Sequence, residues 1–343
     1  MKKINWGIIG LGNIAEKFAE GFNFSENANL LSVSSLNEKK LKKFKKNFSL
    51  SEKYCFTNYQ DLINCNDIDI IYIALPNSMH FKWVLKCLEN KKNTLIEKPA
   101  VMNNFEIEEI KKLLKKQNIF FSEAFMYRFS PHFIKLVELI KNNYIGKLSS
   151  IESSFGINVY SPKKIFGLTI KKPDLNGRLF NRKLGGGAIL DLGCYPVSLG
   201  TYIYSLSKKF DINKIKLDNV KKNFCPSGVE THACAEINFD NHLKCKVVAS
   251  FEKNLGQKTK IFGNKGTIII EDTWSPKENC KIEILGENEN IINIRLNENI
   301  YSYEINQISD HLLNNKIYPE FPIVNLDEII NNTNILHKWI NYN

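Results

Sequence analysis

Asp191 and Tyr195 are four residues apart in a segment that begins with three glycines, residues 185–187. On a helix this spacing puts the carboxylate and the phenol on one face. Pro196 has no amide donor, so it should bend the helix or limit it to a first turn there. The glycines suit a close approach of the backbone to a ligand or to another part of the chain. The segment is typical of a proton-transfer site, although simple packing and helix capping would use the same two side chains.

A candidate cation for this site is Lys98, which follows a short apolar strand predicted at residues 94–96. The carboxyl ends of such strands are where α/β sheets place ligand-binding residues. Removing a proton from an alcohol as a hydride leaves needs a base, and a tyrosine with a pKa near about 10 serves only if a neighbouring cation stabilises its phenolate. We therefore expect Lys98 and Tyr195 to be catalytic, with Asp191 orienting the substrate hydroxyl or the lysine.

The start of the chain carries a glycine pattern, Gly10-x-Gly12-x-x-Ala15, between an apolar run and a helical periodicity. Gly10 permits a tight turn, Gly12 leaves room for a pyrophosphate against the backbone, and Ala15 lets helix and strand pack closely. The N-terminus of the helix supplies free amide donors and a partial positive charge. The pattern alone is weak, but its position after a strand and before a helix predicts a dinucleotide site.

The end of the second predicted strand bears on which dinucleotide is bound. A site that prefers NAD usually has an Asp or Glu there, against the adenosine ribose hydroxyls. Residues 32–37 read Ser-Val-Ser-Ser-Leu-Asn and contain no acid. Nothing there repels a 2′-phosphate, and Ser35 with Lys39 or Lys40 would hold one, unless these lysines are only surface charge. The segment slightly favours NADP over NAD.

Strands and helices must alternate to position these residues. In the first 120 or so residues, the apolar runs predict strands at residues 4–9, 30–33, 69–75, 94–96 and 119–121. Helical periodicity separates them after Gly12 and at residues 38–47, 81–89 and 105–116. This alternation is typical of a parallel sheet with helices on both faces.

After about residue 124 the pattern changes to longer alternating stretches. These predict antiparallel strands at residues 148–157, 232–239, 244–251, 266–271, 281–285 and 291–296. Further helices are expected at residues 129–141, around 188–204, at 304–314 and at 326–342. The predicted fold class is α/β plus α+β: an N-terminal Rossmann domain with a doubly wound parallel sheet in residues 1–123, and a substrate-binding and oligomerisation domain with an open, mostly antiparallel sheet in residues 124–343. Its C-terminal helices are able to pack back on the first domain.

Composition limits the classes of partner. A chain of 343 residues favours two domains. The formal net charge of +11 invites a nucleic-acid reading, but only four of the 47 basic residues are arginine, the residue that base and phosphate recognition favours. The lysines are scattered through helical stretches, where a solvated face explains them better. We expect no nucleic-acid partner.

The eight cysteines form no CxxC pair and match no zinc signature, so free thiols in a reducing cytosol and no metal site are expected. The short apolar run near the N-terminus is interrupted by glycine and asparagine before it resembles a signal peptide. No window approaches the roughly 18 apolar residues of a membrane span. These features predict a soluble, cytoplasmic protein without a membrane partner.

Taken together, five segments resemble the glucose-fructose oxidoreductase and inositol dehydrogenase (Gfo/Idh/MocA) family, in particular its branch of dimeric dihydrodiol dehydrogenases and NADP-dependent xylose dehydrogenases. The segments read GIIGLGNIA at residues 7–15, ALPNSMH at 74–80, EKPA at 97–100, EAFMYRF at 123–129 and GGAILDLGCYP at 186–196. Residues 261–267 look like a later strand pair of the family. No one segment is specific, but their common order is.

The resemblance implies roles for particular residues. Lys98 would be the catalytic lysine, Tyr195 the general acid/base, where many relatives have histidine, and Asp191 its partner. The expected cofactor contacts are Gly10, Gly12, Asn13, Ile14, Ser35, Lys39, Leu75, Pro76, Asn77, His80, Glu97 and Lys98. The expected substrate contacts are Tyr127, Arg128, Asp191 and Tyr195. The family usually has an arginine where this sequence has Leu36, which leaves the choice between NAD and NADP open.

The residues and the resemblance together predict an NAD(P)-dependent oxidoreductase that transfers a hydride between nicotinamide and a sugar-like or cyclic alcohol or carbonyl substrate. One alternative is a sugar–sugar oxidoreductase that keeps its cofactor tightly bound. The other is a non-catalytic nucleotide or sugar sensor on the same fold, because fold does not fix function. The resemblance also implies a homodimer or homotetramer formed through the open face of the second sheet.

Overall fold

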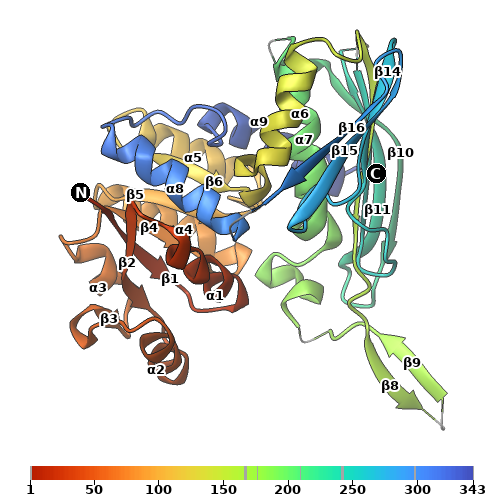
Figure 1. Cartoon of the computed structure of the whole chain (residues 1–343). Helices are drawn as coiled ribbons and strands as arrows, with labels where there is room; N and C mark the ends of the chain where they lie inside the picture. The colour runs from red at the N-terminus through yellow and green to blue at the C-terminus, as the bar shows by residue number, and fades with distance from the viewer. Residues whose placement is uncertain are drawn as a thin grey trace. The chain divides into compact units, whose positions relative to one another are not determined.

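The computed structural model describes residues 2–342 except 166–167, 176, 209, 241–242 and 297–298, and for residues 161–172 it describes the backbone alone. The chain divides into two compact units. Unit 1 contains Met1–Ser130 and Leu296–Ile330, and unit 2 contains Pro131–Arg295 and Asn331–Asn343. The domain boundary expected after residue 123 stays a prediction, and each unit is described by itself (Figure 1).

Unit 1 is built on a six-stranded sheet in which every adjacent pair of strands is parallel. Its order is β3-β2-β1-β4-β5-β6. The strands are β1 (Ile4–Ile9), β2 (Ala28–Ser34), β3 (Cys55–Phe56), β4 (Ile70–Ile73), β5 (Asn93–Glu97) and β6 (Phe121–Ala124). The chain starts at β1, builds outward to β3 and then returns to β4 on the other side of β1. This reversal places a topological switch point between β1 and β4 and confirms the predicted Rossmann sheet.

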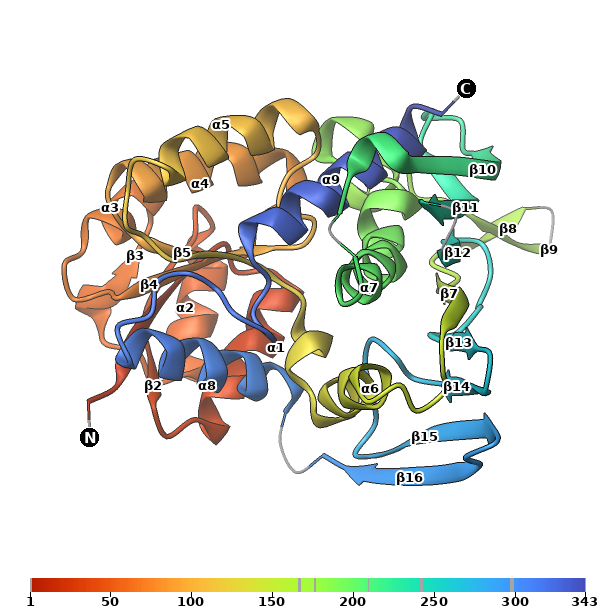
Figure 2. The ribbon, with the colours of Figure 1, turned by 90° about the horizontal axis from the view of Figure 1, so that it is seen from above.

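Helices cover both faces of this sheet, and Figure 2 shows α4 and α5 on one face with α1 and α8 on the other. The helices of unit 1 are α1 (Asn13–Glu20), α2 (Glu38–Asn47), α3 (Tyr59–Asn64), α4 (Asn77–Glu89), α5 (Asn104–Leu114) and α8 (Ile300–Leu313). The last comes from far along the chain. Its Ser309 hydroxyl accepts a hydrogen bond of 2.9 Å from the indole of Trp6 in β1. Segments distant in sequence therefore complete the core of unit 1.

Unit 2 is built on an eight-stranded sheet of order β10-β11-β12-β7-β13-β14-β15-β16. The strands are β7 (Leu148–Gly156), β10 (Ile215–Phe224), β11 (Glu230–Phe239), β12 (Leu243–Ser250), β13 (Thr259–Gly263), β14 (Gly266–Ile270), β15 (Asn279–Gly286) and β16 (Asn290–Arg295). The pairing of β12 with β7 is parallel and the other pairings within this sheet are antiparallel. The expected mostly antiparallel sheet is confirmed. A separate hairpin joins β8 (Ser161–Ile165) to β9 (Leu168–Lys172).

Burial alternates along the sheet of unit 2, as the sequence pattern implied. In β11, Ala233, Ala235, Ile237 and Phe239 are buried, and the residues between them are partly exposed. The buried face packs against α7 (Cys194–Ser205), in which every residue from Cys194 to Tyr204 is buried. The unit also contains α6 (Pro131–Lys141). The helix α9 (Leu326–Ile340) begins in unit 1 and continues in unit 2.

Some elements differ from those predicted. The helix expected at residues 129–141 is a 3₁₀ turn at Met126–Phe129 followed by α6, because Pro131 starts a new helix at its first position. The short elements β3 and α3 and the strand β10 were not predicted. None of the helices among the described residues combines the length and the apolar composition that a membrane span requires.

Candidate active site

The turn after β1 has the shape that the glycine pattern predicts. Gly10 has φ +89°, and a Cβ added there would lie 2.6 Å from the carbonyl oxygen of Ala74. Gly12 precedes α1 in an extended conformation, and a Cβ added there would meet nothing within 4 Å. Asn13 and Ile14 begin α1, so the first amides of the helix lie beside this open space. The space suits a diphosphate held at a helix N-terminus.

The carboxyl ends of the neighbouring strands gather most of the other expected cofactor contacts in unit 1. Leu75 and Pro76 follow β4, and Asn77, which is 4% exposed, begins α4. At the end of β2 the hydroxyl of Ser35 accepts a hydrogen bond of 3.1 Å from the amide of Asn37.

Past this turn, Leu36 is 68% exposed and Lys39 is exposed on α2. The sheet thus brings these expected contacts to one edge. Their roles in binding stay predictions.

Lys98 lies directly after β5, and its side chain is partly exposed. Its backbone amide donates a hydrogen bond of 3.1 Å to Oε2 of Glu97. The other oxygen of Glu97 accepts a hydrogen bond from the hydroxyl of the fully buried Tyr72. These two bonds hold the carboxylate of Glu97 inside unit 1, and only 8% of the residue is exposed.

His80 is fully buried between two loops of unit 1. Its Nδ1 lies 2.9 Å from the carbonyl oxygen of Pro99, and its Nε2 lies 2.8 Å from that of Leu75. The ring therefore connects the loop after β4 to the loop after β5. This placement is compatible with shaping a cofactor site from behind, and the direct cofactor contact expected for His80 stays a prediction.

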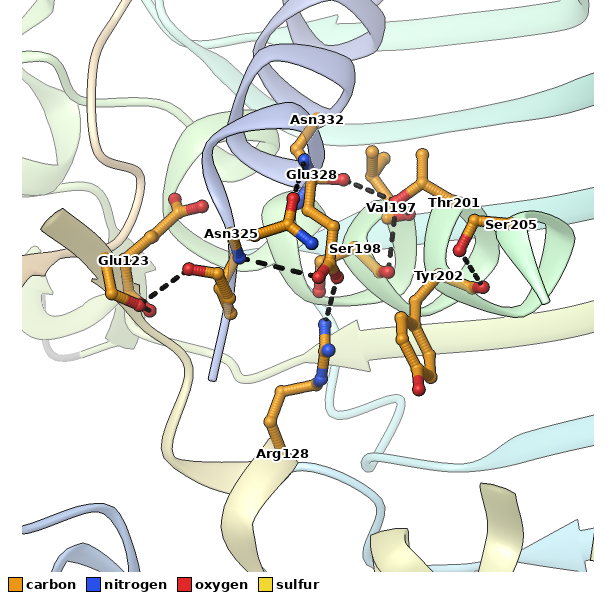
Figure 3. A network of polar contacts seen from close by, with 12 residues as sticks. Glu123, Arg128, Val197, Ser198, Thr201, Tyr202, Ser205, Asn325, Glu328 and Asn332 are labelled. Atoms are coloured by element: carbon orange, nitrogen blue, oxygen red, sulfur yellow. Dashed lines mark hydrogen bonds and ion pairs between the residues drawn. The ribbon is translucent and has the colours of Figure 1, made fainter. Parts of the chain in front are cut away.

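Tyr127 and Arg128 lie in the 3₁₀ turn that follows β6, and both are fully buried. The guanidinium of Arg128 donates a hydrogen bond of 2.6 Å to Oε2 of Glu328, as Figure 3 shows. Glu328 is itself held near the start of α9, where its amide donates to Oδ1 of Asn325. An ion pair this deeply buried is costly to break. The substrate contacts expected for Tyr127 and Arg128 stay predictions.

Asp191 and Tyr195 belong to unit 2. Asp191 lies in a π-helical turn, Ile189–Gly193, that leads directly into α7. Such turns are rare and often occur at functional sites. The side chain of Asp191 is 16% exposed, and Oδ1 accepts a hydrogen bond of 3.2 Å from the guanidinium of Arg178. Pro196 stands in the first turn of α7, which continues beyond it to Ser205 and is therefore not limited to one turn.

Tyr195 is 5% exposed, and its ring lies among aromatic side chains of unit 2. Its ring centroid is 5.2 Å from that of Phe155 and 5.6 Å from that of Trp274. The indole of Trp274 is fixed by a hydrogen bond of 3.1 Å to the carbonyl oxygen of Ser154. Apolar walls of this kind disfavour a phenolate unless a cation lies near.

Sequence reasoning missed several of these neighbours. Phe155 and Trp274 gave no signal, because a ring that encloses a site has the same pattern in sequence as a ring in the core. Arg178 did give a signal. Only four of the 47 basic residues of the chain are arginines, so each arginine is a candidate for a contact that lysine cannot make as well. The meeting of Lys98 with Tyr195 stays a prediction, since the two residues belong to different units.

Comparison with known proteins adds independent information. The family model for the oxidoreductase family with an NAD-binding Rossmann fold, GFO_IDH_MocA, matches residues 4–125. The model for the GFO/IDH/MocA C-terminal domain matches residues 133–269. Together the two matches cover most of the chain: the first includes the six-stranded sheet, and the second includes the eight-stranded sheet up to β14.

Among curated relatives, a trans-1,2-dihydrobenzene-1,2-diol dehydrogenase of Xenopus tropicalis is 28% identical over 274 residues, which are 79% of this chain and 76% of the relative. A D-xylose 1-dehydrogenase (NADP(+)) of Hypocrea jecorina is 26% identical over 307 residues, 84% of this chain and 77% of the relative. Both alignments extend well beyond a single domain.

Solved structures share the fold over nearly the whole chain. A 3-ketoreductase from Actinomadura kijaniata, crystallised with NADP and TDP-benzene, has a TM-score of 0.80 at 17% identity and covers 98% of this chain and 97% of its own. An aldose-aldose oxidoreductase from Caulobacter crescentus, complexed with glycerol, has a TM-score of 0.82 at 20% identity and covers 99% and 97%. At such identities the likeness concerns the fold alone.

Proposed function

The chain belongs to the Gfo/Idh/MocA family of NAD(P)-dependent oxidoreductases, and from this premise we propose that it oxidises a sugar-like or cyclic alcohol or reduces the corresponding carbonyl, with Tyr195 as the acid/base and Lys98 as its cationic partner. The substrate class is supported by the relatives, which are named for a dihydrodiol and for xylose. Both of those names describe a ring or a sugar that bears adjacent hydroxyl groups.

The observation that carries the proposal is the environment of Tyr195. The phenol is enclosed by Phe155 and Trp274 and stands four residues after Asp191, whose carboxylate is held by Arg178. A phenol enclosed in this way, four residues after a carboxylate that an arginine holds, is suited to proton transfer.

The cofactor is supported by the cradle at the start of α1. The open space at Gly12 and the amides of Asn13 and Ile14 would hold the diphosphate, and the loops after β2, β4 and β5 would hold the rest. When bound, the nicotinamide gives or accepts the hydride. NADP is slightly favoured, because no acid at residues 32–37 repels a 2′-phosphate.

In the oxidation direction, Tyr195 takes the proton of the substrate hydroxyl, and the ammonium of Lys98 stabilises the phenolate that this step requires. Asp191, fixed by Arg178, accepts a hydrogen bond from the same or the neighbouring hydroxyl and so orients it. In the reduction direction, Tyr195 returns the proton to the carbonyl oxygen. The protein would act as a homodimer or homotetramer, as the family resemblance implies.

The test begins with a screen of polyols and sugars with NADP and NAD, followed by absorbance of the reduced nicotinamide. In the Lys98→Met variant we expect kcat to fall by about 10²-fold or more, because the phenolate loses its cation. The affinity for NADP, measured by fluorescence titration, should change only a few-fold. Lys86→Met, an exposed substitution of the same kind on α4, is the matched control and should keep full activity.

The partnership of Lys98 and Tyr195 is tested by a double-mutant cycle. If both act on one hydroxyl, the variant Lys98→Met with Tyr195→Phe should be hardly slower than the worse single variant. Full activity of Lys98→Met, or strictly additive losses in the double variant, would overturn the assignment.

A further inference from the structure

The three residues 98–100 have one feature in common: a backbone polar atom of each is held by a buried side chain of unit 1. The amide of Lys98 donates to Oε2 of Glu97 at 3.1 Å. The carbonyl oxygen of Pro99 lies 2.9 Å from Nδ1 of His80. The amide of Ala100 donates to Oε1 of Glu123 at 2.8 Å. The segment that carries Lys98 is thus fixed at three consecutive residues.

The side chains that fix it come from separate elements. Glu97 ends β5, His80 belongs to α4 and Glu123 belongs to β6. Glu123 lies opposite Ile96 in the pairing of β5 with β6, so its side chain reaches the turn from the adjacent strand. Its bond to Ala100 therefore ties the turn to the sheet across 23 positions of sequence.

Burial makes Glu123 an unusual choice for a merely structural position. The residue is 3% exposed, and burial raises the pKa of its carboxyl group to about 8, against the opposing effects of the Ala100 amide and the charge of Lys98. Its second oxygen, Oε2, has no hydrogen-bond partner among the residues that the structure describes. A carboxyl group costs free energy in such surroundings, and its bond to Ala100 offsets only part of that cost.

We propose that Glu123 is a positioning residue for Lys98: together with His80 and Glu97 it fixes the backbone of residues 98–100 and so sets the direction in which the lysine side chain leaves the sheet. The consequence for turnover rests on the function proposed for Lys98. A displacement of about 1 Å at a catalytic group can cost about 10²-fold in rate, so this backbone support matters even though Glu123 touches no reactant.

Two substitutions test the hydrogen bond that Glu123 accepts from Ala100. Glu123→Met fills a similar volume but offers no oxygen to the Ala100 amide, so we expect kcat to fall by about 10-fold or more while KM and the Kd for NADP stay within about twofold. Glu123→Gln keeps a carbonyl oxygen in place of Oε1 and should restore kcat to within about threefold of the original protein. A role in packing alone would not give this split between kcat and KM or this rescue.

A second measurement does not depend on turnover. Hydrogen exchange of the Ala100 amide, followed by mass spectrometry, should speed up by about 10-fold or more in Glu123→Met and remain slow in Glu123→Gln. Glu89→Gln, an exposed substitution of the same kind on α4, is the control, and exchange at Ala100 should not change in this variant.

Should Glu123→Met fail to fold, Glu123→Ala replaces it with the same expectations. Slow exchange at Ala100 in a folded variant without the oxygen acceptor would overturn the proposal, as would a Glu123→Gln protein no better than Glu123→Met in both measurements. If the original protein oxidises none of the alcohols in the screen, yet exchange at Ala100 responds as expected, the proposed function fails and the support of the turn by Glu123 stands.

Discussion

At the scale of single residues, the feature that distinguishes the proposed site is a buried phenol among aromatic rings. Phe155 and Trp274 enclose Tyr195 and keep water from its ring. A phenolate in such surroundings must be stabilised by a cationic side chain nearby, because solvent supplies little stabilisation there. Lys98 is the cation that the family resemblance assigns, and Arg178 fixes the neighbouring carboxylate of Asp191.

This arrangement predicts the effect of Tyr195→Phe. We expect kcat to fall by about 10²-fold or more, because the proton has no acceptor, while thermal stability hardly changes, because phenylalanine keeps the ring contacts with Phe155 and Trp274. Steady-state rates and a thermal unfolding curve of the same preparation check both parts. Phe155→Leu serves as a control that disturbs the enclosure but leaves the hydroxyl. A Tyr195→Phe enzyme with unchanged kcat would remove Tyr195 from the mechanism.

The residues proposed to do chemistry are easier to find in the sequence than the residues that surround or hold them. Lys98, Asp191 and Tyr195 are marked by residue type and by motifs in their own segments. Arg178, Trp274 and Glu123 act on partners 13 to 120 positions away, and no local pattern shows such pairings. Support across a fold is a property of packing, which a single sequence does not display.

At the scale of elements, the two glycines of the turn between β1 and α1 differ in the reason for which glycine stands there. Gly10 is required by the fold, because its φ is +89° and an added Cβ would meet the Ala74 carbonyl oxygen. Gly12 has a backbone conformation that any residue adopts and faces open space, so the fold itself does not require glycine there. Space kept free in this way points to a ligand.

The two glycines therefore predict opposite effects of substitution. Gly12→Val should leave the free energy of unfolding within about 1 kcal/mol of the original value but weaken NADP binding by about 10-fold or more, because the side chain fills the diphosphate space. Gly10→Ala should lower stability itself, through strain at positive φ and the close carbonyl oxygen. Urea unfolding and calorimetric titration with NADP distinguish the two. Unimpaired binding by Gly12→Val would exclude this turn as the diphosphate site.

Elements with a regular apolar pattern were predicted well, and α2 was predicted with its observed bounds, residues 38–47. The strand β10 was missed because it lies at the edge of its sheet, carries several lysines and breaks register twice in its pairing with β11. The π-helical turn before α7 was also missed. The helix is buried on nearly all sides and so has no apolar stripe whose phase an extra residue could shift. Periodicity predicts elements that have one buried face and fails at edges and irregular turns.

At the scale of the whole molecule, buried acids link stability to pH. The carboxyl group of Glu123 has a pKa of about 8 in the folded chain, raised by burial from an ordinary value of 4.5. Below about pH 4.5 both states bind the proton. Between pH 4.5 and 8 the unfolded chain has lost it and the folded chain keeps it, so stability falls as pH rises through this range and levels off above it.

Glu123→Gln removes this dependence. The free energy of unfolding of the original protein minus that of the variant should decrease from pH 5 to pH 8 by an amount on the order of a few kcal/mol. Urea denaturation at several pH values measures it, with Glu89→Gln on the exposed end of α4 as the control. A difference for Glu123→Gln that is flat with pH would show that the carboxyl group is ionised in the folded protein.

A further feature of the whole molecule is that the chain, after forming most of unit 2, contributes residues 296–330 to unit 1. The indole of Trp6 is bonded to a hydroxyl 303 positions later, and the ring of Phe18 contacts Tyr301. During synthesis on a ribosome, the first strands therefore emerge long before the helix that covers them. An excised fragment of residues 1–130 would leave Trp6 and Phe18 uncovered, so the nucleotide-binding half of this molecule is not a detachable module.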